Sequence, residues 1–320
     1  FVDTGISTYQ IIFLVGFYTG LFSMTGGGPI AEDTWREGEG EDRIAIIPVT
    51  GMIIADDVWY YRKAVEAVID DPSIKAVVLR VESGGGSATA SDQIWDQLQR
   101  LKTQRDLPII ASFGGIAASG GYYVAAAADE IFAEPTTITG SIGVLATAFT
   151  IENLLTEKLG IQPEIIHSTP ATEKGTANNI FRGWTPKDRD LMQKLLDAMH
   201  EQFVQVVISG RSGVLGEREV RELANGRVYT ADEASAMKLV DEIGYIEEAI
   251  DRARQAAGIA QPNPPIVTYR QRVGIVNQLL QVRGPSLYET MSNPAGYDPA
   301  AVRRLVHEMA QTQVMYLYQP

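Results

Sequence analysis

One serine stands where the chain turns from an apolar segment into an alanine-rich one. Ser119 follows the apolar run 108–113 and precedes Gly120, Gly121 and the run 122–128. The first run has strand character, and the second contains good helix formers without a breaker. A serine at a helix N-terminus lies near free N–H groups, which stabilise the negative charge that develops in acyl transfer. A helix cap, or a site where only a small residue fits, is the alternative role.

The composition restricts the chemistry open to this serine. The chain has no cysteine, which excludes thiol nucleophiles, disulfides and cysteine-bound metals. Its three histidines, His167 at the end of a predicted strand, His200 and His307, form no recognisable metal-binding pair, so we expect no metal and no cofactor. The base for Ser119 is therefore one of these histidines or a lysine. A net charge of −13 argues against nucleic acid as a partner.

A second glycine-rich element precedes Ser119 by about thirty residues. Gly84, Gly85 and Gly86 follow the apolar run 75–81. Because glycine has no side chain, no side chain of their own covers the N–H groups of these three residues. This geometry suits an oxyanion hole, a tight turn or a phosphate cradle. A Walker A loop is excluded, because no Gly-Lys-Ser/Thr sequence follows.

The N-terminal segment differs from the rest of the chain. It carries no charge between Thr4 and Ala31, and residues 11–18 are continuously apolar. A helix over residues 9–24 would span about 24 Å, against about 30 Å for the hydrocarbon core. We expect a truncated membrane anchor over residues 1–30 and an acidic linker over 31–42. A signal-peptide apolar region and an amphipathic surface helix are the alternatives. The acidic flank is compatible with an extracytoplasmic catalytic body.

Strands and helices alternate through the body of the chain. Strand patterns cover residues 43–49, 75–81 and 108–113, and helix patterns cover 57–69, 89–102 and 185–209. The last helix is expected to begin with Thr185 as its N-cap, followed by Pro186, with Asp188 three residues after the cap. Alternation of this kind predicts an α/β fold with its site at the C-terminal ends of parallel strands.

Several separated motifs resemble those of the peptidase family S49, the family of signal peptide peptidase A. They appear in order as Val81-Glu82-Ser83-Gly84-Gly85-Gly86, Ala117-Ala118-Ser119-Gly120-Gly121-Tyr122-Tyr123, Ile138-Thr139-Gly140-Ser141-Ile142-Gly143 and Asn225-Gly226-Arg227-Val228-Tyr229. The resemblance covers residues 43–258. Gly84 stands where the family usually has a proline, a departure that makes this loop more flexible.

The resemblance implies a ClpP/crotonase-like superhelical fold of ββα units over residues 43–260. It implies a membrane serine endopeptidase with a Ser/Lys dyad, which degrades cleaved signal peptides and similar apolar peptides. Ser119 takes the place of the nucleophile and Lys174 that of the base, with Lys158 as the other candidate. Ser141 would orient the amine, and the oxyanion hole would consist of Gly85, Gly86 and Gly120. A solvated lysine has a pKa of about 10.4, and burial lowers it enough for a base.

The chain carries one copy of this core, and the resemblance implies that identical subunits close a ring with grooves between neighbours. Residues 261–320 form a C-terminal extension whose end, 314–318, is either a subunit-contact strand or a segment in a substrate groove. Two other functions remain open: an inactive ring-forming scaffold, and a crotonase-type acyl-CoA enzyme that uses Glu82 or Glu130.

Overall fold

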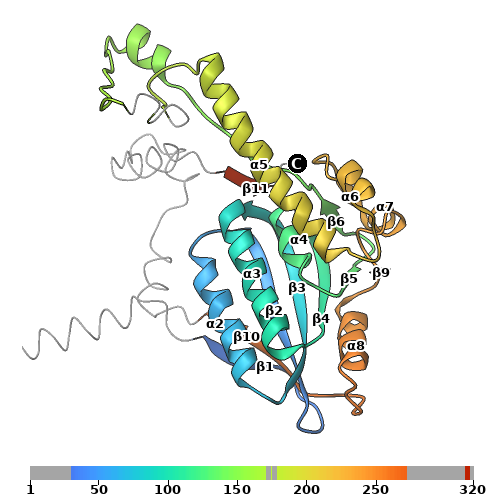
Figure 1. The fold of residues 1–320 in the computed structure, drawn as a ribbon. Helices are drawn as coiled ribbons and strands as arrows, with labels where there is room; N and C mark the ends of the chain where they lie inside the picture. Colours follow the sequence, from blue (N-terminus) through green and yellow to red (C-terminus); the bar gives the residue numbers. More distant parts are fainter. Residues whose placement is uncertain (1–29, 171–173, 175–178, 272–313, 318–320) are drawn as a thin grey trace, which may run out of the picture.

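The protein is built around one large, mainly parallel sheet. The structure is a computed structural model that describes residues 30–170, 174, 179–271 and 314–317. The central strand order is β1-β10-β2-β3-β4-β5-β9, and four shorter strands pair off this path (Figure 1). The strands are β1 (Ala31–Arg36), β2 (Arg43–Ile53), β3 (Ile74–Ser87), β4 (Ile109–Ala118), β5 (Glu130–Ala133), β6 (Ile138–Gly140), β7 (Leu145–Ala146), β8 (Val228–Thr230), β9 (Glu242–Ile243), β10 (Ile266–Arg270) and β11 (Val314–Leu317).

Helices cover both faces of the sheet, which explains the nearly continuous apolar runs in the central strands. Along β2, Ala45 and Ile47 join the core under α2, α3 and α4, whereas Ile44 and Ile46 join a second core under α8 (Figure 1). A strand buried on both faces has no polar side to alternate with its apolar one. The helices are α2 (Asp57–Asp70), α3 (Ala88–Arg105), α4 (Gly120–Ala125), α5 (Pro186–Gly210), α6 (Glu217–Leu223), α7 (Ala231–Ala236) and α8 (Ile246–Ala256).

Helix α5 begins as the sequence predicts. Thr185 is its N-cap, and a capping box joins the Thr185 hydroxyl to the Asp188 amide and the Asp188 carboxylate to the Thr185 amide. Arg182 adds two hydrogen bonds to the same carboxylate, at 2.5 and 3.0 Å. The two capping-box bonds satisfy backbone donors at the start of the helix, and the Arg182 bonds hold the Asp188 carboxylate in place.

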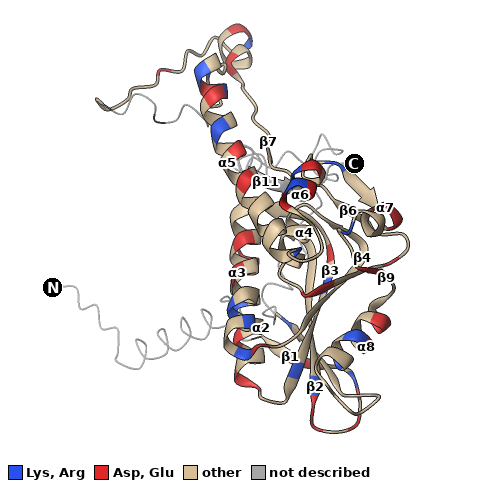
Figure 2. Ribbon diagram, turned by 45° about the vertical axis from the view of Figure 1, so that its right-hand side comes forward, with Lys and Arg blue, Asp and Glu red and all other residues tan. Residues whose placement is uncertain are grey.

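The N-terminal half of α5 and residues 147–170 project from the body as an arm (Figure 1). The projecting part of α5 carries both acidic and basic side chains, whereas residues 147–170 include a π-helical turn, η1 (Leu154–Lys158) (Figure 2). The predicted strand ending at His167 is wrong, because residues 161–168 have no regular secondary structure. Among the described residues, no strand pairs with this apolar segment of the arm.

Both ends of the described core differ from the predicted linker and extension. Residues 31–36 form β1, which pairs antiparallel with β10, and β10 in turn lies parallel to β2. Ala31 and Ile266 are buried. The acidic segment is therefore half strand, and the first part of the extension belongs to the sheet. Periodicity in so short and charged a strand is too weak to reveal its partner.

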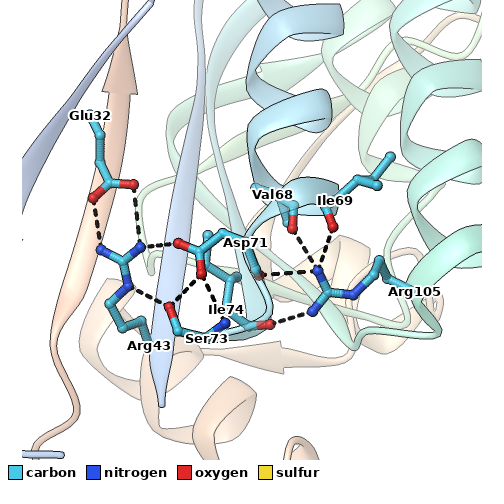
Figure 3. A network of polar contacts seen from close by, with 8 residues as sticks. All are labelled: Glu32, Arg43, Val68, Ile69, Asp71, Ser73, Ile74 and Arg105. Atoms are coloured by element: carbon cyan, nitrogen blue, oxygen red, sulfur yellow. Dashed lines mark hydrogen bonds and ion pairs between the residues drawn. The ribbon is translucent and has the colours of Figure 1, made fainter. Parts of the chain in front are cut away.

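A polar network joins the outer strands to the end of α2 (Figure 3). Arg43 donates to Glu32 at 2.7 Å, to Ser73 at 2.8 Å and to the Asp71 carboxylate. Burial raises the pKa of Asp71, but hydrogen bonds from Ser73 and Arg43 outweigh it and leave that pKa below its ordinary value. The network thus ties β1, β2 and the α2–β3 turn together where the central strands begin, away from their C-terminal ends.

Arg105 completes the same corner (Figure 3). Its guanidinium donates to the carbonyl oxygens of four residues between the last turn of α2 and the start of β3, at 2.8 to 3.1 Å. The four acceptors are Val68, Ile69, Asp71 and Ile74. The last carbonyls of a helix have no intrahelical partner, so an arginine fork is a suitable cap.

The predicted anchor over residues 1–30 lies outside the described residues except for Ile30. Among the helices that the structure describes, none combines the length and the apolar character needed to cross a bilayer.

Candidate active site

Ser119 occupies a strained turn between β4 and α4. Its backbone angles are φ 55° and ψ −120°, a region that residues other than glycine rarely adopt. The side chain is fully buried, and no described residue hydrogen-bonds to its Oγ. A strained serine between a strand and a helix has the strand–turn–helix setting in which nucleophilic serines occur. An unpaired buried hydroxyl costs free energy, so this arrangement suits catalysis better than capping.

Strand β6 holds the backbone of Ser119. The Ser119 amide donates to the Gly140 carbonyl at 2.8 Å, and β4 lies parallel to β6 up to the pair Ala118–Gly140. Ser141 follows directly, with a φ of 51°, and its amide donates to the Arg227 carbonyl at 2.7 Å. Ser141 is 6% exposed. The structure therefore brings Ser119 and Ser141 together at the ends of neighbouring strands.

The glycine-rich segment 84–86 continues β3 and contacts the start of α4. A Cβ at Gly120 would lie 3.2 Å from the Gly86 amide nitrogen and 2.5 Å from the Ser91 hydroxyl. A Cβ at Gly86 would lie 2.0 Å from the carbonyl oxygen of Ile53. Both positions are closed to any side chain. The two predicted glycine elements thus meet beside Ser119, which sequence spacing alone only suggested.

Ser83 holds the middle of this segment. Gly85 has a φ of 100°, and its amide donates to the Ser83 hydroxyl at 3.1 Å. That hydroxyl donates in turn to the Gly51 carbonyl at 2.6 Å. The Gly85 N–H is therefore already used inside the segment, whereas the oxyanion hole expected from the resemblance included it with Gly86 and Gly120. The sequence signal for this lock was a serine two residues before a glycine, a spacing too common to be noticed.

Neither candidate lysine reaches Ser119 within the described part of the chain. Lys174 and Lys158 are both exposed, and Lys158 lies in η1 on the arm. Ser119 Oγ has no partner among the described residues, so no lysine amine hydrogen-bonds to it there. The nucleophile and the predicted base therefore remain apart in this single chain.

The two carboxylates of the acyl-CoA alternative are engaged elsewhere. The Glu82 carboxylate accepts hydrogen bonds from the amides of Gly115 and Ile116, at 3.0 and 3.3 Å. Glu130 forms an ion pair with Arg252. Both carboxylates therefore have structural partners in this arrangement. The described residues also contain no cluster of three or more histidine, aspartate or glutamate side chains that could hold a metal.

Strand β11 lies against the glycine-rich end of β3. Met315, Tyr316 and Leu317 pair antiparallel with Ser87, Gly86 and Gly85, respectively. On its other side β11 pairs antiparallel with β7. The gap between β3 and β7 therefore accepts an extended segment close to the turn that carries Ser119.

The chain resembles known peptidases along most of its length. The model of peptidase family S49 matches residues 101–260. An inferred protease of Synechocystis sp. (slr0021) is 34% identical over 254 residues, which cover 79% of this chain and 88% of that protein. An inferred signal peptide peptidase SppA of Enterococcus faecium is 33% identical over 245 residues, covering 72% of this chain and 68% of that protein. The chloroplastic serine protease SPPA of Arabidopsis thaliana is 35% identical over 69% of this chain and only 33% of its own length.

A solved structure of a mutant ClpP1 from Listeria monocytogenes matches with a TM-score of 0.43 and 16% identity, over 64% of this chain and 94% of that one. Likeness at that level carries no weight by itself. The family match and the observed alternation of strands and helices confirm the predicted α/β, ClpP/crotonase-like fold. The extent of identity to the Synechocystis protein, together with the family match, leaves one conclusion: the chain belongs to peptidase family S49 and is a serine protease.

Proposed function

We propose that the protein is a membrane-anchored endopeptidase in which Ser119 and Lys174 form a catalytic dyad. Its substrates would be cleaved signal peptides and similar apolar peptides, as the name of the Enterococcus relative suggests. One observation carries the proposal: Ser119 is buried, strained and unpaired beside a glycine-rich strand end. No hydrogen bond to a described residue has to break before this hydroxyl passes its proton to a base.

The reaction follows ordinary acyl transfer. Ser119 Oγ attacks the peptide carbonyl carbon while its proton passes to the neutral lysine amine. The amides of Gly86 and Gly120 stabilise the oxyanion, since the Gly85 amide is bonded to Ser83. Collapse of the tetrahedral intermediate breaks the C–N bond, and the leaving amine takes the proton from lysine. Water then hydrolyses the acyl-enzyme with lysine again acting as base.

A neighbouring copy of the chain supplies the lysine in this proposal. Lys174 is exposed, and Ser119 has no lysine partner among the described residues of its own chain. Several apolar side chains between residues 149 and 181 are also exposed: Phe149, Leu154, Leu159, Ile161, Ile166 and Phe181. Burial of these side chains against a second copy would remove apolar surface from water and carry Lys174 to another subunit's serine. Repetition of this contact gives a ring.

Peptide substrates would bind as an added strand. Strand β11 already pairs antiparallel with the residues around Gly86. Main-chain pairing of this kind accepts many sequences and leaves specificity to the side-chain pockets. It suits a protease that degrades apolar peptides of varied sequence.

A fluorophosphonate probe tests the nucleophile directly. The folded protein is expected to become labelled at Ser119, as located by mass spectrometry of the digested adduct. A folded protein that is not labelled would instead be the inactive scaffold or the acyl-CoA enzyme.

Mixing two inactive variants tests the origin of the base. Ser119→Ala and Lys174→Ala are each expected to lack peptidase activity, whereas Lys158→Ala keeps it. Co-assembly of the first two variants rebuilds intact sites at about a quarter of the interfaces if each site takes its serine and lysine from different copies. No recovery, with co-assembly demonstrated, would place both residues in one chain. Loss of activity in Lys158→Ala and its retention in Lys174→Ala would assign the base to Lys158.

The proposed location is the extracytoplasmic side of the cell membrane. The support is the charge-free segment between Thr4 and Ala31 and the acidic residues that follow it. Protease protection of intact cells and of inverted vesicles tests the orientation. The body is expected to be digested in the first preparation and protected in the second.

A further inference from the structure

Glu82 lies between the two glycine-rich elements of the site. In sequence it precedes Ser83 and Gly84, at the end of β3 that contacts α4. In space its carboxylate accepts two hydrogen bonds from β4, the Gly115 amide at 3.0 Å on Oε2 and the Ile116 amide at 3.3 Å on Oε1. One side chain therefore joins the segment that ends β3 to the segment that leads into Ser119.

The β4 segment held by Glu82 is an irregularity in the sheet. Val81 pairs with Phe113, but Ser83, only two residues later, pairs with Ala117. Residues 114–116 therefore bulge outward opposite Glu82 alone. A Cβ at Gly114 would lie 1.6 Å from Glu82 Oε2, so the bulge fits closely around the carboxylate. Without an acceptor, the amides of Gly115 and Ile116 would lack their side-chain partner at this break in the ladder.

The bulge sets where Ser119 lies. After it, β4 runs in register with β6, and three residues beyond Ile116 comes Ser119, whose amide is bonded to Gly140. A change in the bulge would shift the strand end and the strained turn that follows it. Such a shift matters because a misplacement of about 1 Å at a reacting group costs about 100-fold in rate.

We propose that Glu82 is a positioning residue for the hydrolysis proposed above: its carboxylate fixes the bulge at residues 114–116 and thereby the place of Ser119 relative to the glycine-rich end of β3. Glu82 touches no reacting atom in this role. The inference rests on the proposed function only where turnover is the measured quantity.

The neighbouring Glu134 provides a matched control. Arg80 lies 2.7 Å from a Glu134 oxygen and 3.9 Å from a Glu82 oxygen, so both acids share one cation. Of the two carboxylates, the one bonded to the bulge amides is that of Glu82. Substitution of Glu134 therefore changes the charge around Arg80 without removing an acceptor from the bulge.

The test compares Glu82→Ala, Glu82→Gln and Glu134→Gln with the wild-type full chain. Glu82→Ala is expected to lower kcat about 10- to 100-fold with KM changed less than about threefold, because the nucleophile moves while the peptide groove remains. Glu82→Gln keeps one acceptor oxygen, so its kcat is expected to fall less than that of Glu82→Ala. Glu134→Gln is expected to stay within about twofold of wild type. The same order is expected for the rate of Ser119 labelling by the fluorophosphonate.

Amide hydrogen exchange gives a readout that does not depend on turnover. Exchange over residues 114–119 is expected to accelerate in Glu82→Ala and not in Glu134→Gln. Unchanged exchange there, or equal losses of kcat in Glu82→Ala and Glu134→Gln, would overturn the inference. If Glu82→Ala does not fold, Glu82→Gln decides the question by the same comparison. A wild-type protein without turnover or labelling would refute the proposed function, while the exchange result would still decide the role of Glu82.

Discussion

The amide of Ser119 donates to the carbonyl of Gly140 at 2.8 Å, which joins the strained turn of β4 to the end of β6. Ser141, the residue after Gly140, also has a positive φ. The bond holds the Ser119 backbone in a conformation that costs free energy, and separately the Ser119 hydroxyl has no hydrogen-bond partner among the described residues. The neighbouring strands thus hold the turn in place before any substrate binds.

Ser119→Ala is expected to lower kcat by about 10⁴-fold or more, because the nucleophile is lost. The variant is also expected to be as stable as wild type or more stable by up to about 1–3 kcal/mol, since an unpaired buried hydroxyl disappears. Urea unfolding and peptide hydrolysis measure the two effects. Ser119→Gly, which suits a φ of 55° better, is expected to exceed Ser119→Ala in stability. Turnover retained by either variant would move the nucleophile elsewhere.

The three consecutive glycines of β3 are expected to tolerate alanine differently. A Cβ at Gly84 would meet only the side chain of Ile116, at 3.4 Å. The free energy of unfolding of Gly84→Ala is therefore expected to lie within about 0.5 kcal/mol of the wild-type value. The Cβ added in Gly86→Ala would clash with the Ile53 backbone, and the free energy of unfolding is expected to fall by about 1–3 kcal/mol or more. Gly85→Ala is strained by its φ of 100°. Equal stability of all three variants, measured by urea unfolding, would mean that the strand end is more open than the structure shows.

The start of α5 is expected to weaken in acid. Hydrogen bonds from Arg182, followed by those from the Thr185 amide and hydroxyl, hold the pKa of Asp188 well below its usual range, although burial opposes them. A lowered pKa in the folded state stabilises the protein above the usual aspartate value of about 4, and this contribution is lost as pH falls through the lowered value. Asp188→Asn is therefore expected to lower the free energy of unfolding by about 0.5–2 kcal/mol at pH 7, and by less below pH about 4. Urea unfolding at several pH values measures the difference.

Asp190 is the control for this change. It lies two residues further along α5, is well exposed, and pairs with Lys194 at 2.7 Å. Exposed pairs contribute little, so Asp190→Asn is expected to match wild type within about 0.5 kcal/mol at every pH. A pH-independent loss in Asp188→Asn would contradict the charge-based account.

Truncation at the N-terminus separates the expected anchor from the sheet. Removal of residues 1–29 is expected to leave unfolding unchanged, because β1 stays paired with β10. Removal of residues 1–40 is expected to cost at least about 1 kcal/mol, since it deletes buried Ala31 and the Glu32 partner of Arg43. Thermal unfolding of both truncated proteins tests this. Equal midpoints would show that β1 contributes nothing to the core.

Shortening the chain after Gln313 removes β11 from the gap between β3 and β7. If β11 and an extended peptide compete for the same backbone groups, the shortened protein is expected to show a lower KM for peptides. Its kcat is expected to change little, because Ser119 and its neighbours are untouched. Steady-state hydrolysis measures both constants, and an unchanged KM would mean that peptides bind elsewhere.

Local sequence was sufficient for much of the fold. The apolar runs in β2, β3 and β4 predicted buried strands because both faces of each strand meet helices. The start of α5 was predicted from Thr185, Pro186 and Asp188, since a capping box depends only on residues within one turn. The position of Ser119 between a strand and a helix was also readable, because strand and helix propensities change there within a few residues.

Contacts between distant segments were decided only by the tertiary structure. The pairing of β1 with β10 joins residues 230 or more positions apart, and no local pattern in so short a strand specifies such a partner. Glu82 looked like a free carboxylate until the bulge of β4 folded around it. The bond from the Gly85 amide to Ser83 is equally invisible in a row of glycines. The sequence determined which residue types stand in the motifs, whereas tertiary packing decided which of their polar groups remain free, because a hydrogen bond depends on where two segments meet in space.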